Sequence, residues 1–179
     1  MVVEPQLTEL IGEYRTNIDA KGRVGLGGFR QHFEDTVIAV KMDGYLAVMS
    51  PAQFRIVSEG IRQRTAIDRP EQVGRLFDIE VQRFKRHFYS NAFEVSLDAQ
   101  GRMTVPAKMR EELTLVSEVV WAGSGDMLEL WQAKQHDDKE TLWRKEGGPE
   151  RMVHVVTGQT PAAAMPPAGP ADDGAPEEE

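Results

Sequence analysis

The sequence predicts an α+β fold made of two copies of one module, arranged with pseudo-twofold symmetry about a helical insert. The main observation is a repeated pentapeptide. Asp19-Ala20-Lys21-Gly22-Arg23 returns 79 residues later as Asp98-Ala99-Gln100-Gly101-Arg102. The segment between the copies has helical periodicity instead. The last 22 residues, 158–179, include 5 prolines and 6 alanines but no aromatic residue, which predicts a disordered tail.

Both copies have the same order of elements. An alternating strand leads into the Asp-Ala-x-Gly turn, where glycine accepts a positive φ and aspartate caps the turn through its own backbone. A second strand, a short helix and a hairpin of two strands follow. The predicted strands are 13–18, 23–26, 37–40 and 45–49 in the first copy, and 92–97, 102–105, 119–122 and 127–131 in the second.

The short helix is clearer in the second copy, where Pro106 opens a helical segment over 107–113. The first copy lacks this proline and has glycine at positions 25, 27 and 28. A glycine costs about 1 kcal/mol against alanine in a helix interior. We therefore predict that the first short helix begins late or is frayed.

Two helices are predicted between the copies, beginning at Pro51 and Pro70. Apolar residues of the second helix recur at steps of three and four, which indicates one buried stripe. They are Val73, Leu76, Phe77, Val81, Phe84 and Phe88. The basic residues in and just before this helix largely avoid the stripe, which favours a face exposed to solvent. They are Arg69, Arg75, Arg83, Lys85 and Arg86. The alternative is a secondary nucleic-acid surface. The predicted organisation is a first repeat at 10–54, a helical insert at 55–90, a second repeat at 91–146 and the tail at 158–179.

Composition narrows the possible function classes. The formal net charge is −8, which argues against a protein that coats nucleic acid by bulk positive charge. The chain has no cysteine, which excludes disulfides, cysteine-ligated zinc and thiol catalysis. No apolar run approaches the roughly 18 residues needed to cross a bilayer, and the N-terminus does not resemble a signal peptide. We expect a cytoplasmic protein with no membrane partner.

The case for an enzyme is thin. The four histidines form no metal-ligand spacing, and His136-Asp137-Asp138 is typical of a helix start on the surface. The glycine-rich segment 123–126 lacks the lysine of a phosphate-binding loop. We expect no catalytic residue, metal, cofactor or small-molecule substrate.

The arginine that follows the turn glycine in each copy is harder to explain by packing. A guanidinium suits phosphate oxygens or guanine edges, which favours contact with DNA. The alternative is an Arg–Asp ion pair that holds the turn.

Residues 12–23, the second motif 98–106 and Leu128-Glu129-Leu130-Trp131 resemble the MraZ family, across roughly residues 10 to 143. These proteins are bacterial regulators of the division and cell-wall gene cluster, related to AbrB-type DNA-binding proteins. The resemblance implies a β-barrel-like fold of two AbrB-like swapped-hairpin repeats and a ring-shaped homo-oligomer. It also implies a nucleoid-associated protein that binds double-stranded DNA at short direct repeats in its own promoter region.

Carried over by position, the family's motif falls on Asp19, Lys21, Gly22 and Arg23, with Arg23 as the chief DNA contact. The expected DNA-binding residues are Arg15, Lys21, Arg23, Arg30 and Arg102. The prediction is therefore a sequence-specific DNA-binding transcriptional regulator and not an enzyme. The alternative is an oligomeric scaffold or partner-binding protein that has lost DNA binding, which the acidic balance and the altered first repeat favour.

Overall fold

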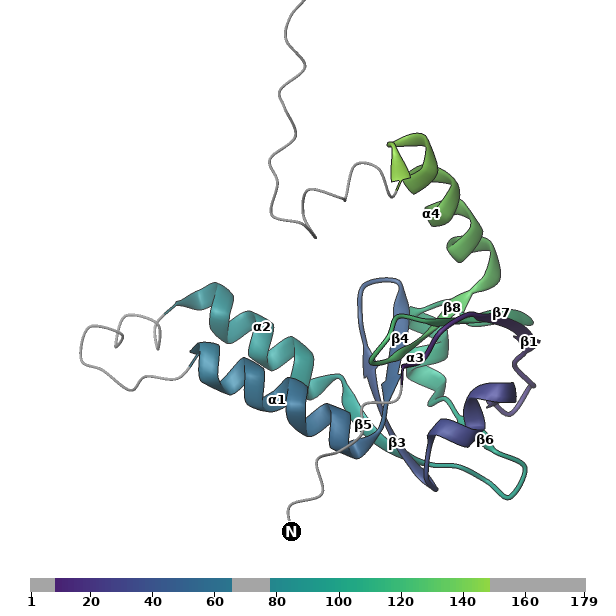
Figure 1. The fold of residues 1–179 in the computed structure, drawn as a ribbon, viewed down its shortest axis with the longest axis horizontal. Helices are drawn as coiled ribbons and strands as arrows, with labels where there is room; N and C mark the ends of the chain where they lie inside the picture. The colour runs from purple at the N-terminus through teal and green to yellow at the C-terminus, as the bar shows by residue number, and fades with distance from the viewer. Residues whose placement is uncertain (1–8, 66–77, 149–179) are drawn as a thin grey trace, which may run out of the picture. The chain divides into compact units, whose positions relative to one another are not determined.

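The computed structural model describes residues 9–65 and 78–148. The chain divides into two compact units, residues 1–138 and 139–179. The first unit contains the strands of the described residues, the helices that cover them and the first residues of the helix α4 (Ala133–Lys145) (Figure 1). The described part of the second unit contains the rest of α4.

Among the described residues, six strands form one antiparallel sheet in the order β1-β7-β8-β4-β3-β5, and two more form a separate ribbon, β2-β6. The strands of the first repeat are β1 (Glu13–Asn17), β2 (Arg23–Gly25), β3 (Thr36–Lys41) and β4 (Tyr45–Met49). Those of the second are β5 (Ala92–Ser96), β6 (Arg102–Thr104), β7 (Glu118–Gly123) and β8 (Leu128–Gln132). Each strand lies within one or two residues of its predicted bounds.

The two repeats make equivalent strand pairings with each other. The first strand of each repeat pairs with the third strand of the other, so that β1 pairs with β7 and β5 with β3. The registers match as well: Thr16 lies opposite Val119, and the equivalent residues Val95 and Val37 face each other. The ribbon β2-β6 and the central pair β4-β8 each join equivalent strands. Pseudo-twofold symmetry therefore holds at the level of hydrogen-bonded strands.

The two faces of the sheet bury different partners. One face, called here the inner face, packs Trp121 and Leu130 against Val24 and Met103 of the ribbon, all fully buried. On the outer face, Met49 and its neighbours pack against the two insert helices, and Trp131 packs beside the start of α4. The ribbon is thus held to the inner face by apolar side chains.

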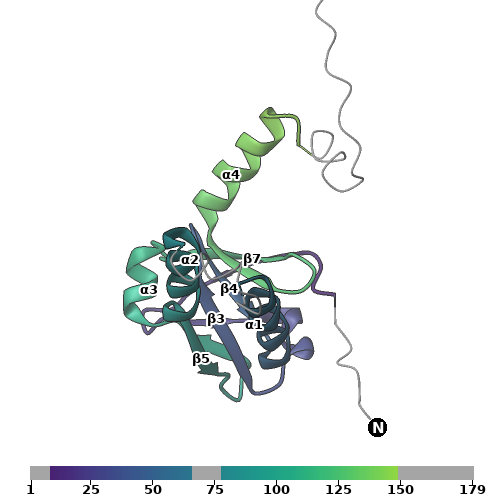
Figure 2. The ribbon, with the colours of Figure 1, turned by 90° about the vertical axis from the view of Figure 1, so that its left-hand side faces the viewer.

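The insert folds back on itself. Helix α1 (Pro51–Thr65) begins at the predicted proline, and α2 (Ile79–Ser90) returns beside it (Figure 1). Phe54 and Phe88 stack between the helices with ring centroids 5.8 Å apart. Figure 2 shows α1 in front of β3 and β4, whose outer-face residues it covers. The predicted start at Pro70, and the apolar positions before Ile79, lie outside the described residues. Phe84, predicted on the buried stripe, is 49% exposed.

The short helix differs between the repeats. In the second repeat α3 (Ala107–Glu112) is an α-helix that follows Pro106, as predicted. In the first repeat η1 (Gly27–His32) is wound as a 3-10 helix. It begins at the equivalent position and not late, and it buries Phe29 against the inner face. The ring of Tyr14 lies so close to Gly27 that a Cβ there would be 2.5 Å from Tyr14 Cε1, which explains the glycine.

Two predictions need correction. The sheet is open: within the described residues no strand pairing joins its end strands β1 and β5, so it is not a closed barrel. The ribbon packs across the inner face through side chains instead of completing the sheet, because its short strands pair with each other. The second correction concerns His136, which lies in α4 as predicted but is buried, with its ring against Trp131. The predicted tail, 158–179, lies outside the described residues.

Candidate nucleic-acid interface

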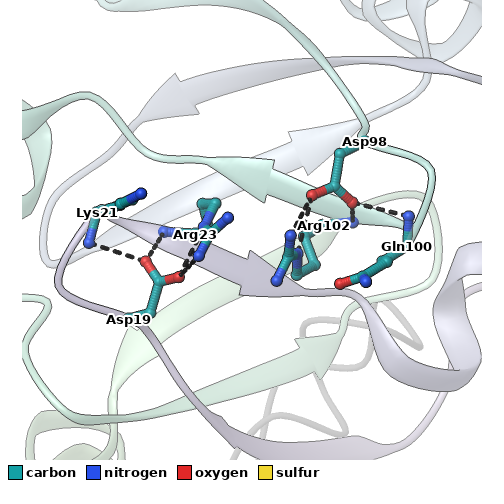
Figure 3. Close-up of polar contacts among 6 residues, drawn as sticks. All are labelled: Asp19, Lys21, Arg23, Asp98, Gln100 and Arg102. Carbon is teal, nitrogen blue, oxygen red and sulfur yellow. Dashed lines mark hydrogen bonds and ion pairs between the residues drawn. The ribbon is translucent and has the colours of Figure 1, made fainter.

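The first D-A-x-G-R turn is built around the carboxylate of Asp19 (Figure 3). Its Oδ1 accepts hydrogen bonds from the backbone N–H groups of Lys21 and Arg23, both at 2.9 Å. Its Oδ2 accepts from Arg23 Nε at 2.7 Å and lies 2.6 Å from Nη2. One carboxylate oxygen therefore closes the turn while the other holds the guanidinium.

The second turn repeats this arrangement atom for atom (Figure 3). Asp98 Oδ1 accepts from the N–H groups of Gln100 and Arg102, at 2.9 and 3.0 Å. Asp98 Oδ2 lies 2.8 Å from both Nε and Nη2 of Arg102. The Arg–Asp pair, given above as the alternative to DNA contact, is thus present in both repeats.

These contacts stabilise the charged form of both aspartates. The backbone N–H and the side chain of Arg23 lower the pKa of Asp19 to about 2. The guanidinium and backbone N–H of Arg102 lower the pKa of Asp98 in the same way. Both carboxylates are therefore ionised at neutral pH, and each motif is a charged pair.

The ribbon brings the two arginines onto one surface. In the β2-β6 register, Arg23 lies opposite Thr104 and Gly25 lies opposite Arg102. Residues alternate between the two faces of a strand, so both arginines point away from the buried Val24 and Met103. Arg23 and Arg102 therefore occupy diagonal positions, which are about 7–8 Å apart in an antiparallel pair.

The ribbon is anchored to the inner face of the sheet. Trp121, fully buried in the inner face, donates its Nε1–H to the carbonyl of Gly25 at 2.9 Å. The ribbon also extends by one hydrogen bond at each end, from Val105 N–H to Gly22 O and from Leu26 N–H to Gly101 O. A rigid support of this kind fixes the position of exposed side chains.

Two more of the predicted residues lie beside the ribbon. Lys21 is exposed in the first turn. Arg30, in η1, lies against the second turn, where a Cβ on Gly101 would be 2.8 Å from Arg30 Cδ. The Arg30 guanidinium donates to the carbonyl of Phe33 and pairs with Asp35 at 3.0 Å. Arg30 therefore places a further basic side chain beside the turn of the second motif.

Arg15 lies elsewhere. It faces Val120 across the β1-β7 pair, and Val120 belongs to the outer face with Trp131. The Arg15 guanidinium pairs with Asp137 at 2.5 Å and with Glu13 at 3.4 Å. The hydrogen bond to Asp137 raises the pKa of Arg15. The structure thus separates Arg15 from the four other predicted residues, which lie at the ribbon on the inner face.

One basic residue beside the ribbon was absent from the predicted set. Arg110, in α3, lies against the first turn as Arg30 lies against the second. The alignment of the two repeats pairs Phe29-Arg30 with Met109-Arg110, and this equivalence could have identified Arg110 from the sequence. The basic side chains at the ribbon are therefore Lys21, Arg23, Arg30, Arg102 and Arg110. Three of them form ion pairs: Arg23 with Asp19, Arg30 with Asp35 and Arg102 with Asp98.

Other chemistry is sparse in the described residues. They contain no group of three or more His, Cys, Asp or Glu side chains arranged to hold a metal ion. None of their helices is both long and apolar enough to span a bilayer. Of the basic residues predicted on the second insert helix, Arg83 pairs with Glu80 at 3.2 Å, and Arg69 and Arg75 lie outside the described residues.

The family model and the individual relatives that match this chain carry the same family name. A family model described as "MraZ protein, putative antitoxin-like" matches residues 88–147, which include the whole second motif. Proteins named "Transcriptional regulator MraZ" from Alkaliphilus oremlandii, Alkaliphilus metalliredigens and Natranaerobius thermophilus are 32%, 31% and 30% identical to this chain. The matches cover 68%, 70% and 72% of this chain and 79%, 82% and 84% of the relatives. These names denote regulators and not enzymes.

Proposed function

Because the chain belongs to the MraZ family, whose members compared above are named transcriptional regulators, we propose that it regulates transcription by binding specific sequences in double-stranded DNA. The proposed contact surface is the ribbon β2-β6 with its two turns. Arg23 with Lys21 is the proposed main contact, Arg102 is a second contact, and Arg30 flanks them.

The observation that carries this proposal is the pairing of β2 with β6, which gathers both motif arginines on one exposed face. A two-stranded ribbon fits the width of the major groove. Arginine donors match the acceptors that DNA presents on base edges and phosphates. A local cationic surface of this kind also reconciles DNA binding with a net charge of −8.

We further propose that the target is a set of short direct repeats in the promoter region of the protein's own gene cluster, which includes division and cell-wall genes. A ring-shaped homo-oligomer would present one ribbon per subunit to successive repeats. Linked contacts raise the effective concentration, so that individually weak contacts suffice. The end strands β1 and β5 leave open edges that favour contact between copies. The protein would then act in the cytoplasm, on the nucleoid.

The proposed modules are two AbrB-like swapped-hairpin repeats, residues 10–54 and 91–146, with residues 55–90 as the insert between them. The strand pairing supports this division, because it is the same for both repeats: the first strand of each repeat pairs with the hairpin of the other. A duplicated and fused module would produce this pairing.

A gel-shift experiment tests the proposal. The full chain is titrated against a duplex covering the region directly upstream of its own gene, and against a shuffled duplex of equal length and composition. We expect preferential binding of the upstream duplex. Equal affinity for both duplexes at physiological salt would refute sequence-specific binding to this target. Light scattering on the same preparation tests the oligomer, and a monomer at micromolar concentration would refute the ring.

A second candidate is an oligomeric scaffold that no longer binds DNA. The Arg–Asp pairs favour it, since each motif arginine is already neutralised by its own aspartate. The two candidates differ in the gel shift: a scaffold oligomerises but binds neither duplex.

A further inference from the structure

We propose that Asp19 and Asp98 are positioning residues for DNA recognition. Each would hold the following motif arginine side-on, so that the other edge of the guanidinium is presented to two adjacent hydrogen-bond acceptors on DNA. This inference rests on the proposed DNA-binding function.

Within each carboxylate, the two oxygens contact different groups. Only Oδ1 accepts from the backbone of the turn, from Lys21 and Arg23 in the first repeat, and it does so beside the backbone hydrogen bonds between Asp19 and Arg23 and between Gly22 and Asp19. A turn of this type needs no second acceptor. Oδ2 is directed at the guanidinium instead, with Nε at 2.7 Å and Nη2 at 2.6 Å. The contact with Arg23 is therefore additional to the capping of the turn.

The aspartate contacts only one edge of the guanidinium. The group is planar and carries five N–H donors. The Nε and Nη2 donors that face Asp19 form its side edge. The end edge, formed by Nη1 and the second N–H of Nη2, points away from the carboxylate. That edge is a fork of two parallel donors, which matches adjacent acceptors on a base or two oxygens of a phosphate.

The ion pairs pre-organise both motif arginines. A free arginine side chain loses considerable rotamer entropy when it is fixed in a complex. Here Arg23 and Arg102 are fixed before DNA arrives, on a ribbon that is anchored to the inner face through Trp121. Both remain partly exposed, with 35% and 31% of their side chains accessible. The same geometry occurs twice on one surface.

Charge alone predicts the opposite effect, and this makes the idea testable. Asp19 places a negative charge on a surface proposed to contact phosphates, so its removal should strengthen DNA binding if only net charge matters. If Asp19 positions Arg23, its removal weakens binding. Whether the loss of Asp19 strengthens or weakens DNA binding therefore distinguishes a net-charge effect from the positioning of Arg23.

The test compares Asp19→Asn with wild type in the gel shift described above, using the upstream and shuffled duplexes. Asparagine keeps an acceptor for the turn but replaces Oδ2 with an N–H donor that repels the guanidinium. Asp43→Asn is the matched control, because Asp43 is an exposed acid in the turn between β3 and β4. We expect a loss of roughly tenfold in affinity for Asp19→Asn and no loss for the control.

The two duplexes identify the acceptors. A loss confined to the upstream duplex assigns them to base edges, and an equal loss on both duplexes assigns them to phosphates. Unchanged or tighter binding by Asp19→Asn, with wild type still preferring the upstream duplex, overturns the inference alone. If wild type binds neither duplex, the proposed function fails and the inference falls with it.

A double-mutant cycle distinguishes positioning from a purely structural role. The cycle is measured at low salt, where Arg23→Ala still binds the duplex. In the Arg23→Ala background, Asp19→Asn should cause no further loss of affinity, because the arginine to be positioned is gone. A further loss of similar size would show that Asp19 acts through the fold, and would overturn the inference. Thermal melting confirms that each variant is folded. If Asp19→Asn does not fold, Asp19→Ser replaces it, since serine can also cap a turn but does not reach the guanidinium.

Discussion

The side chain of Arg110 in the second repeat lies against Gly22 in the turn of the first repeat. A Cβ placed on Gly22 would be 2.6 Å from Arg110 Nε and 2.8 Å from the carbonyl oxygen of Val105. The equivalent contact joins Arg30 of the first repeat to Gly101 of the second. Each repeat thus packs an arginine side chain against the motif turn of the other.

This contact predicts that Gly22→Ala destabilises the protein. The backbone of Gly22 has φ +80°, which an alanine adopts only with strain, and the new methyl group would displace Arg110. We expect a loss of about 1–3 kcal/mol in the free energy of unfolding, measured by chemical denaturation. Gly28→Ala is the control, because a Cβ there meets nothing within 4 Å. Equal stability of the two variants would contradict the contact.

The two motif arginines should differ in their effect on DNA binding. Lys21 in the first turn adds a positive charge, whereas the second turn has the neutral Gln100 in its place. Arg23→Ala should weaken binding to the upstream duplex by about 1–3 kcal/mol per subunit. With several subunits engaged, specific binding should be lost at physiological salt. In the same gel shift, Arg102→Ala should bind the upstream duplex far better than Arg23→Ala does.

Size-exclusion chromatography is run beside that gel shift, since both variants should keep the oligomer of the wild type. The assignment of the first motif as the main contact is wrong if Arg102→Ala loses binding while Arg23→Ala keeps it.

Stability should fall in acid through the titration of Asp19. Its pKa is about 2 in the folded protein, against an ordinary value of 3.8 for an aspartate without such contacts. Between roughly pH 4 and pH 2 the unfolded chain therefore binds a proton that the folded chain does not, and lower pH favours unfolding. In Asp19→Asn this group is absent, so the fall in melting temperature across that window should be smaller than in wild type. Circular dichroism melts at several pH values measure the difference, and Asp43→Asn should retain the wild-type slope.

Arg15 should be dispensable for DNA binding. It lies on the outer face of the sheet and pairs with Asp137, away from the ribbon. Neither Arg15→Ala nor Asp137→Ala should change the gel shift, and both should lower the melting temperature slightly, because they remove the same ion pair. If Arg15→Ala weakens binding while Asp137→Ala strengthens it, Arg15 contacts DNA and is partly masked by the aspartate.

Local sequence patterns determined most of the elements of this protein. The repeated D-A-x-G-R turns, the alternating strands around them and the helix after Pro106 depend on interactions between near neighbours, so they could be predicted from one sequence. The same holds for Asp19 as the cap of its turn, because its partners Lys21 and Arg23 are close in the chain.

Only the tertiary structure decided how these elements combine. The same strand pattern permits pairing within a repeat or between repeats, and local propensity does not distinguish them. The choice depends on contacts between residues far apart in the chain, such as Trp121 with Gly25, 96 positions away, and Val24 with Met103 in the ribbon. In the resulting fold, Arg23 and Arg102 lie on one ribbon, Arg15 lies on the opposite face and the sheet is open. Local patterns do not predict this arrangement, because burial of the inner face is a property of the whole fold.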